Sequence, residues 1–135
     1  MNKTLVMMVG FPRSGKTTIA TAIAASRHAP IVNPDNIRLA LHGHQYIQQA
    51  EPFVWAIAHV MVRALFHTYD TVVLDACNNT RKRRDEWKSR DWRREFQHIA
   101  TGADVCRNRA GQDDGLVAAI DRMAAAFEPV TDDEN

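Results

Sequence analysis

One stretch of the sequence combines glycine, lysine and threonine at a spacing that suits phosphate binding. Residues 10–17 are GFPRSGKT, which fits the pattern G-x-x-x-x-G-K-[ST]. The glycines let the backbone bend around a phosphate and present its N–H groups inward. The Lys16 ammonium can reach the β- and γ-phosphates of a nucleoside triphosphate, and the Thr17 hydroxyl can ligate Mg²⁺. The pattern predicts a Walker A loop in which further contacts come from Gly10, Arg13, Ser14, Gly15 and Thr18.

A second candidate is the carboxylate of Asp75, which ends the apolar segment 72–74. In P-loop proteins an aspartate at such a position lies beside the loop and supports Mg²⁺ together with the loop threonine, here Thr17. It could instead only cap the following turn, but the loop at 10–17 favours the metal role. The next residue, Ala76, cannot act as a base for water. This favours transfer to a bound acceptor over hydrolysis.

Asp35 and Arg38 form a third candidate pair. They are three residues apart, so they share one face if this segment is helical. Asp35 could accept the proton of an attacking hydroxyl, and Arg38 could hold an acceptor phosphate with two N–H groups. The alternative is a helix-terminal ion pair worth well under about 1 kcal/mol. Spacing alone favours that alternative.

These residues must be positioned by a small α/β fold. The apolar run 4–9 ends at a glycine, as a buried parallel strand does. Alternating strands and helices predict a parallel sheet that is covered on both faces. We expect strands at 30–33, 71–75 and 96–101, and helices at 17–26, 35–41, 51–67, 81–95 and 113–127, with a loop at 42–50 and a frayed acidic tail at 129–135.

Composition narrows the class of protein. A chain of 135 residues with 45% hydrophobic and 24% charged residues fits one globular domain. Cys77 and Cys106 make no metal-binding pattern and are expected to be free thiols. No apolar run approaches the roughly 20 residues of a membrane helix. We therefore expect a soluble protein of the cytoplasm that has no membrane partner.

The segment from Arg81 to Arg94 concentrates positive charge around two tryptophans. A basic helix of this kind could follow a nucleic-acid backbone, or it could simply solvate itself through ion pairs along the helix. Trp87 and Trp92 are five residues apart and do not share a narrow helical stripe, so at least one is expected in the core. Thr80 is expected to cap the helix.

The motifs together resemble the polynucleotide-kinase-like branch of the P-loop kinases. The matching segments occur in the family's order and span nearly the whole chain: GFPRSGKT (10–17), NPDNIR (33–38), VVLDACNNTRKRRDEW (72–87), CRNR (106–109) and the helix end FEP (127–129). The resemblance implies a three-layer P-loop NTPase fold with about four parallel strands. It also implies one kinase domain over residues 1–135 with a short helical lid at about 103–112.

The same resemblance implies roles for individual residues. The family's general base matches Asp35, and the arginine that contacts the acceptor-side phosphate matches Arg38. Arg107 and Arg109 match a lid that closes over the donor phosphates. The family usually has a longer gap between its lid arginines, so the resemblance leaves open which of the two is catalytic. The alternative for both arginines is a solvated face.

These expectations describe an ATP-dependent kinase that uses Mg²⁺. The implied acceptor is a hydroxyl on a nucleic acid or nucleotide, with DNA favoured: a 5′-hydroxyl end, or the hydroxymethyl group of a modified base such as 5-hydroxymethyluracil in phage DNA. A phage-encoded enzyme would work in the host cytoplasm. The alternatives are a P-loop kinase for a sugar or an antibiotic, and a nucleotide-binding switch or weak NTPase. The sequence predicts no oligomeric state.

Overall fold

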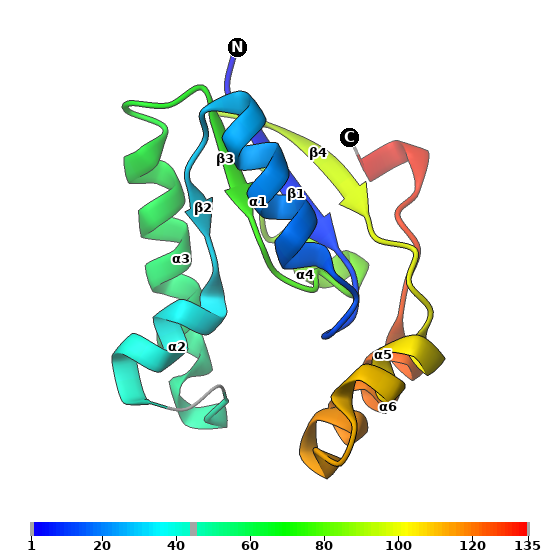
Figure 1. The fold of residues 1–135 in the computed structure, drawn as a ribbon. Helices are drawn as coiled ribbons and strands as arrows, with labels where there is room; N and C mark the ends of the chain where they lie inside the picture. Colours follow the sequence, from blue (N-terminus) through cyan, green and yellow to red (C-terminus); the bar gives the residue numbers. More distant parts are fainter. Residues whose placement is uncertain (1, 44–45, 135) are drawn as a thin grey trace.

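The computed structural model describes residues 2–43 and 46–134, in which four strands form one parallel sheet. The strands are β1 (Thr4–Val9), β2 (Ile31–Val32), β3 (Thr71–Leu74) and β4 (Arg93–His98), in the order β2-β3-β1-β4. The main helices are α1 (Lys16–Arg27), α2 (Pro34–His42), α3 (Glu51–Leu65), α4 (Arg81–Asp85), α5 (Ala103–Ala110) and α6 (Asp114–Ala126). The predicted α/β fold with a small parallel sheet is confirmed (Figure 1).

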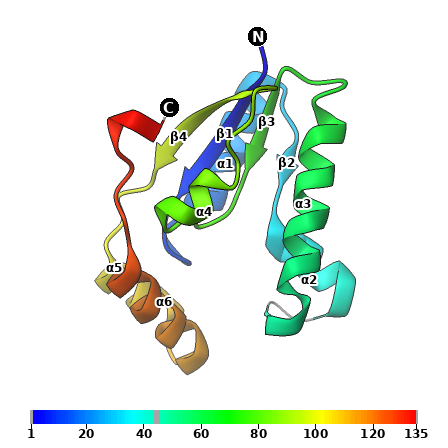
Figure 2. The same cartoon turned by 180° about the vertical axis from the view of Figure 1, so that it is seen from behind.

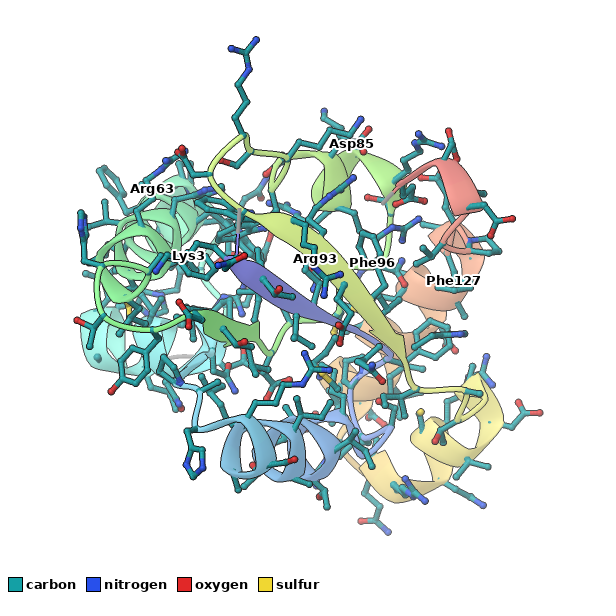
Figure 3. All side chains as sticks on the ribbon, turned by 90° about the horizontal axis from the view of Figure 1, so that it is seen from above. Lys3, Arg63, Asp85, Arg93, Phe96 and Phe127 are labelled. Atoms are coloured by element: carbon teal, nitrogen blue, oxygen red, sulfur yellow. The ribbon has the colours of Figure 1, made fainter. Side chains whose placement is uncertain are left out.

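Alternate residues of the central strand β1 pack against different helices. Leu5 and Met7 belong to a core that includes Val54, Ala58 and Val62 of α3. On the opposite face, Val6 and Met8 pack with α1 through two alanines, Ala20 and Ala24. Figure 3 shows the resulting three layers, with helices on both sides of the sheet. Because both faces are covered, β1 is a continuous apolar run, as the sequence predicted.

Helices α5 and α6 pack against each other around Cys106, Ala110 and Ile120, and α5 lies within the segment 103–112 that was predicted as a lid. The pair lies at the end of the sheet where β1 and β3 terminate, on the opposite side of that end from α2 (Figures 1 and 2). The Phe127 ring, just after α6, contacts Phe11 of the loop at 10–17 edge to face, with centroids 5.7 Å apart. The α5–α6 pair therefore packs next to the phosphate loop.

The predicted helix over 81–95 is wrong. Helix α4 ends at Asp85, and residues from Arg93 onward form β4, so the last strand is 93–98 rather than 96–101. The many charged residues of this segment are typical of an exposed helix, which is why a helix was predicted. Strand β4 carries charged residues because it is an edge strand, and it pairs with β1 in parallel register. Both tryptophans of this segment are core residues: Trp87 is fully buried, and Trp92 stacks on Phe66.

The basic stretch is also less exposed than a nucleic-acid-binding helix would be, because Arg84 and Arg94 are buried. Thr80 caps α4 as predicted, since its hydroxyl accepts a hydrogen bond from the Arg83 N–H. One exposed cation of the stretch, Arg93, lies at the amino-terminal end of β4, which is the end of the sheet away from the phosphate loop.

The predicted frayed tail is wrong for the described part of residues 129–135, which ends at Glu134. Residues Asp132–Glu134 form a 3-10 turn, and the Glu134 carboxylate is fully buried against Arg84. Arg84 donates to it from Nε at 2.7 Å and from Nη2 at 3.1 Å, and Arg94 donates to the Glu134 carbonyl. A buried arginine needs such a partner, and the acidic tail supplies it.

The predicted loop at 42–50 is partly confirmed. Helix α2 extends to His42, and a 3-10 turn at Gln48–Ala50 leads into α3. His44 and Gln45 lie outside the described residues, so the prediction is not tested there.

Candidate active site

The phosphate loop connects β1 to α1 and uses backbone conformations that few residue types adopt. Gly15, at the cap of α1, has φ 93°, and Arg13 has φ 65°, so both lie in the left-handed region. At Gly10 a Cβ atom would lie 2.8 Å from the Ser14 Oγ, which is closer than real Cβ contacts. The Gly10 N–H donates to the Cys77 carbonyl, which joins the loop to the end of β3. The loop glycines are therefore required by geometry.

Two groups at the loop are available to bind an anion: the N–H groups at the start of α1 and the hydroxyl of Ser14. The first turn of α1 begins at Lys16, so its free N–H groups and positive dipole end point at the loop. The Ser14 hydroxyl is buried and has no hydrogen-bond partner, while the Ser14 carbonyl accepts from Thr101. A buried hydroxyl without a partner is costly, and a bound phosphate oxygen would satisfy it.

Thr17 and Asp75 meet as the sequence predicted. The Thr17 hydroxyl donates to Asp75 Oδ2 at 2.8 Å, and the Asn33 side-chain amide donates to the same oxygen at 3.2 Å. The other carboxylate oxygen, Asp75 Oδ1, is buried without a partner. A hydroxyl and a carboxylate oxygen are hard ligands that suit Mg²⁺, which also takes waters and substrate phosphates. These two residues therefore fit a magnesium ion.

Asn33 connects this pair to the predicted base. Its side-chain oxygen accepts the Asp35 N–H at 2.9 Å and so caps α2, while its amide nitrogen contacts Asp75. Pro34 occupies the first turn of α2, which suits the fixed φ of proline. The Asp35 side chain is 55% exposed and accepts from Arg38 at 2.6 Å. One asparagine therefore joins the strand end that carries Asp75 to the helix that carries Asp35.

Arg38 has a second partner that the sequence did not indicate. Glu51, the first residue of α3, accepts from Arg38 Nε at 2.9 Å and from Nη2 at 2.7 Å. The guanidinium also lies over the Trp55 ring, 5.8 Å from its centroid. Burial acts to lower the Arg38 pKa, but the carboxylates of Glu51 and Asp35 outweigh it and raise the pKa. Arg38 is thus held on three sides.

Cys77 lies among the charged groups of the site. Burial is the main reason that the pKa of its thiol is raised, and the charges of Lys16, Asp35, Asp75 and Arg38 all act on it. The charges of four predicted site residues therefore reach this one thiol. Sequence analysis missed Cys77 because nothing in its neighbours marks it, apart from its place two residues after Asp75.

The two arginines of the predicted lid differ in their surroundings. Arg107 donates to Asp104 and to Asp121 on the neighbouring helix α6. Arg109 instead donates to the carbonyl of Arg13 in the phosphate loop at 3.1 Å. Of the two, Arg109 is the one that the structure places against the loop.

A substitution at the candidate metal site has a specific expected effect. Changing Asp75→Asn removes the negative oxygen while keeping the shape, so we expect the Mg²⁺ concentration for half-maximal phosphoryl transfer to rise about 10–100-fold. The measurement is a Mg²⁺ titration of initial rates at saturating ATP. Asp91→Asn, which removes an exposed carboxylate near the far end of the sheet, is the control and should leave the titration unchanged. An Asp75→Asn enzyme with the wild-type Mg²⁺ dependence would contradict the assignment.

Comparisons with known proteins place the chain in a family and show which solved structures share its fold. A family model described as an AAA domain matches residues 5–130. The chain belongs to that family. No curated protein matches it significantly. Among the described residues, no helix is both long and apolar enough to cross a membrane.

Several solved structures share the fold. A chain of the Pnkp1/Rnl/Hen1 complex is 22% identical with a TM-score of 0.71, over 79% of this chain and 38% of the other. A gluconokinase from Sinorhizobium meliloti 1021 is 21% identical with a TM-score of 0.60, over 94% and 75%. Shikimate kinase from Acinetobacter baumannii is 14% identical with a TM-score of 0.55, over 98% and 87%.

These likenesses define the class. The chain has a P-loop kinase fold of the polynucleotide-kinase-like type, and it spans about two fifths of the chain from the Pnkp1/Rnl/Hen1 complex. The comparisons show the family and the fold, and they do not indicate an acceptor.

Proposed function

We propose that this chain is an ATP-dependent kinase that transfers the γ-phosphate to a hydroxyl group of a bound acceptor. The observation that carries the proposal is the Asn33 bridge. Through two hydrogen bonds it connects Asp75, the candidate metal ligand, to the backbone N–H of Asp35, whose side chain is the candidate base. A nucleotide-binding switch has no need for the helix start that carries this carboxylate to be joined to the candidate metal site.

Each residue then has a role in the transfer. Backbone N–H groups of the loop and the Lys16 ammonium hold the β- and γ-phosphates, and Thr17 and Asp75 hold the magnesium ion. When bound, Mg²⁺ neutralises the charge that develops on the phosphate oxygens. Asp35 accepts the proton of the attacking hydroxyl, and Arg109 supplies positive charge from the lid side. Ala76 is buried and nonpolar, so this position offers no base for water.

The acceptor that we favour is a nucleic acid or nucleotide, with DNA first. A 5′-hydroxyl end and the hydroxymethyl group of a modified base are the two candidate positions. The shared fold with a chain of an RNA repair complex supports a nucleic-acid acceptor, and the preference for DNA rests on the resemblance of the motifs. A small-molecule acceptor is the second candidate. It is supported by the shared fold with gluconokinase and shikimate kinase, and by the hydrogen bonds that Arg38 already makes to Glu51.

The test is to find where the γ-phosphate goes. The protein is incubated with γ-labelled ATP, Mg²⁺ and a panel of acceptors: 5′-hydroxyl oligonucleotides, hydroxymethylated DNA, free nucleosides and sugars. We expect label on one class of hydroxyl, and at least a 100-fold lower rate for Lys16→Ala, because the lysine contacts the transferred group. If no acceptor is labelled, or if Lys16→Ala labels as well as the parent, the proposal is wrong.

A further inference from the structure

The acceptor side of the site contains a guanidinium, that of Arg38, three of whose five N–H groups already donate to carboxylates. Arg38 presents two N–H groups to Glu51 in a bidentate arrangement and a third to Asp35. Only 14% of the Arg38 side chain and 16% of the Glu51 side chain are exposed. The Trp55 ring covers a further part of the guanidinium. The bidentate pair is therefore largely shielded from the solvent that weakens surface ion pairs.

Charge adds to this geometry. Asp35, Arg38 and Glu51 together carry a net charge of −1, because two carboxylates surround one guanidinium. A phosphate that approached Arg38 would meet this excess negative charge, and it would have to displace Glu51 to bind the Nε–Nη2 edge of the guanidinium with two hydrogen bonds. A displaced Glu51 would then be left half-buried without its partner, which is costly.

We infer that Glu51 determines acceptor specificity by occupying Arg38, so that the acceptor presents an uncharged group to this side of the site. This inference rests on the proposed kinase function and narrows its substrate class. The favoured acceptor is a hydroxyl whose carrier needs no phosphate at Arg38, such as a hydroxymethyl group on a base or the hydroxyl of a nucleoside. A 5′-hydroxyl nucleotide that is gripped by its 3′-phosphate is disfavoured. In this arrangement Arg38 positions Asp35 and does not bind an acceptor phosphate.

The kinetic test compares adenosine with adenosine 3′-monophosphate as acceptors, using the ratio of their kcat/KM values. For the wild-type protein we expect a ratio within threefold of one. Glu51→Gln keeps the shape of the side chain and one acceptor oxygen, but it removes the charge that competes with phosphate. We expect this variant to prefer the 3′-monophosphate at least tenfold.

A matched control exists at the other edge of the sheet. Glu95 on β4 accepts from Arg27 in a bidentate pair at 2.6 and 3.3 Å, so Glu95→Gln makes the same chemical change away from the acceptor side. We expect Glu95→Gln to keep the wild-type ratio. A wild-type protein that prefers the 3′-monophosphate tenfold or more would overturn the inference, as would a Glu51→Gln variant with the wild-type ratio.

A second readout does not depend on catalysis. The Arg38 Nε–H signal is followed by ¹⁵N NMR, assigned by its loss in Arg38→Lys, with the nucleotide site filled by a non-hydrolysable ATP analogue and Mg²⁺. On titration with adenosine 3′-monophosphate, we expect a shift in Glu51→Gln and none in the wild-type protein. A shift in the wild-type protein, or no shift in either, would overturn the role of Glu51. If no acceptor is ever labelled, the kinase proposal fails, and this titration still decides the role of Glu51.

Discussion

Asp35→Asn is expected to lower phosphoryl transfer by about 10²–10⁴-fold while leaving ATP binding unchanged. Asparagine keeps the size of the side chain and an oxygen that can accept from Arg38 at the start of α2. What it loses is the ability to take a proton from the attacking hydroxyl. The rate of labelled transfer and the affinity for ATP, measured by calorimetry, separate these two properties.

The control for this prediction is Asp70→Asn. Asp70 is an exposed carboxylate paired with Lys3 at the other end of the sheet, so its loss should change neither quantity. A nucleotide-binding switch would not respond to Asp35→Asn in its turnover. Unchanged transfer in Asp35→Asn would therefore remove the base assignment, and loss of ATP binding would show that Asp35 serves the nucleotide instead.

The largest effect on stability is expected at the C-terminal tail. Glu134→Gln leaves the Arg84 guanidinium buried without a compensating charge, since both side chains are fully buried in the pair. Breaking a buried ion pair from one side costs about 3–5 kcal/mol, a large part of the free energy of unfolding of a small domain. Urea denaturation followed by tryptophan fluorescence measures the loss as a lower midpoint at constant slope.

A second tail carboxylate provides the comparison. Asp133 also pairs with an arginine, Arg81, but its side chain is 66% exposed, so Asp133→Asn should shift the midpoint far less than Glu134→Gln. Equal effects of the two substitutions would show that burial does not increase the contribution of the Glu134 ion pair to the free energy of unfolding.

The pH dependence of stability gives an independent check on Glu134. Burial acts to raise the pKa of Glu134, but hydrogen bonds from Arg84 and from the Thr131 N–H outweigh it and lower the pKa. The carboxylate therefore stabilises the fold above its unfolded pKa of about 4.3, and this contribution is lost as the pH falls through the lower folded pKa. The difference in unfolding free energy between wild type and Glu134→Gln should shrink on acidification. A constant difference from pH 7 to pH 3 would contradict the pairing.

Local signals in the sequence were sufficient to predict the phosphate loop and the segments that lie beside it. The loop, the strand that ends at Asp75 and the start of α2 each carry their own turn and capping residues, so they could be placed without tertiary information. The contact between Thr17 and Asp75 followed because the carboxyl ends of neighbouring parallel strands meet at one edge. The ion pair of Asp35 and Arg38 followed from helical spacing alone.

Contacts between distant segments could not be predicted in this way. Glu51 reaches Arg38 across 13 residues, and nothing in its neighbours distinguishes it from a solvent-exposed helix start. Arg84 and Arg94 look like surface charges until the tail buries them, 50 and 40 residues from Glu134. The strand that begins at Arg93 was predicted as helix because an edge strand exposes polar side chains. It therefore lacks the continuous apolar run that marks β1 as a strand. Each error concerns a residue whose environment is set by a partner far along the chain.

The fate of the γ-phosphate is the measurement that tests the central claim most directly. With γ-labelled ATP, Mg²⁺ and the acceptor found in the panel at saturation, we predict that most of the label consumed by the wild-type protein appears on the acceptor hydroxyl, and that little appears as inorganic phosphate. Label that appears only as inorganic phosphate, at a rate the acceptor does not change, would show that the protein hydrolyses ATP and is not a kinase.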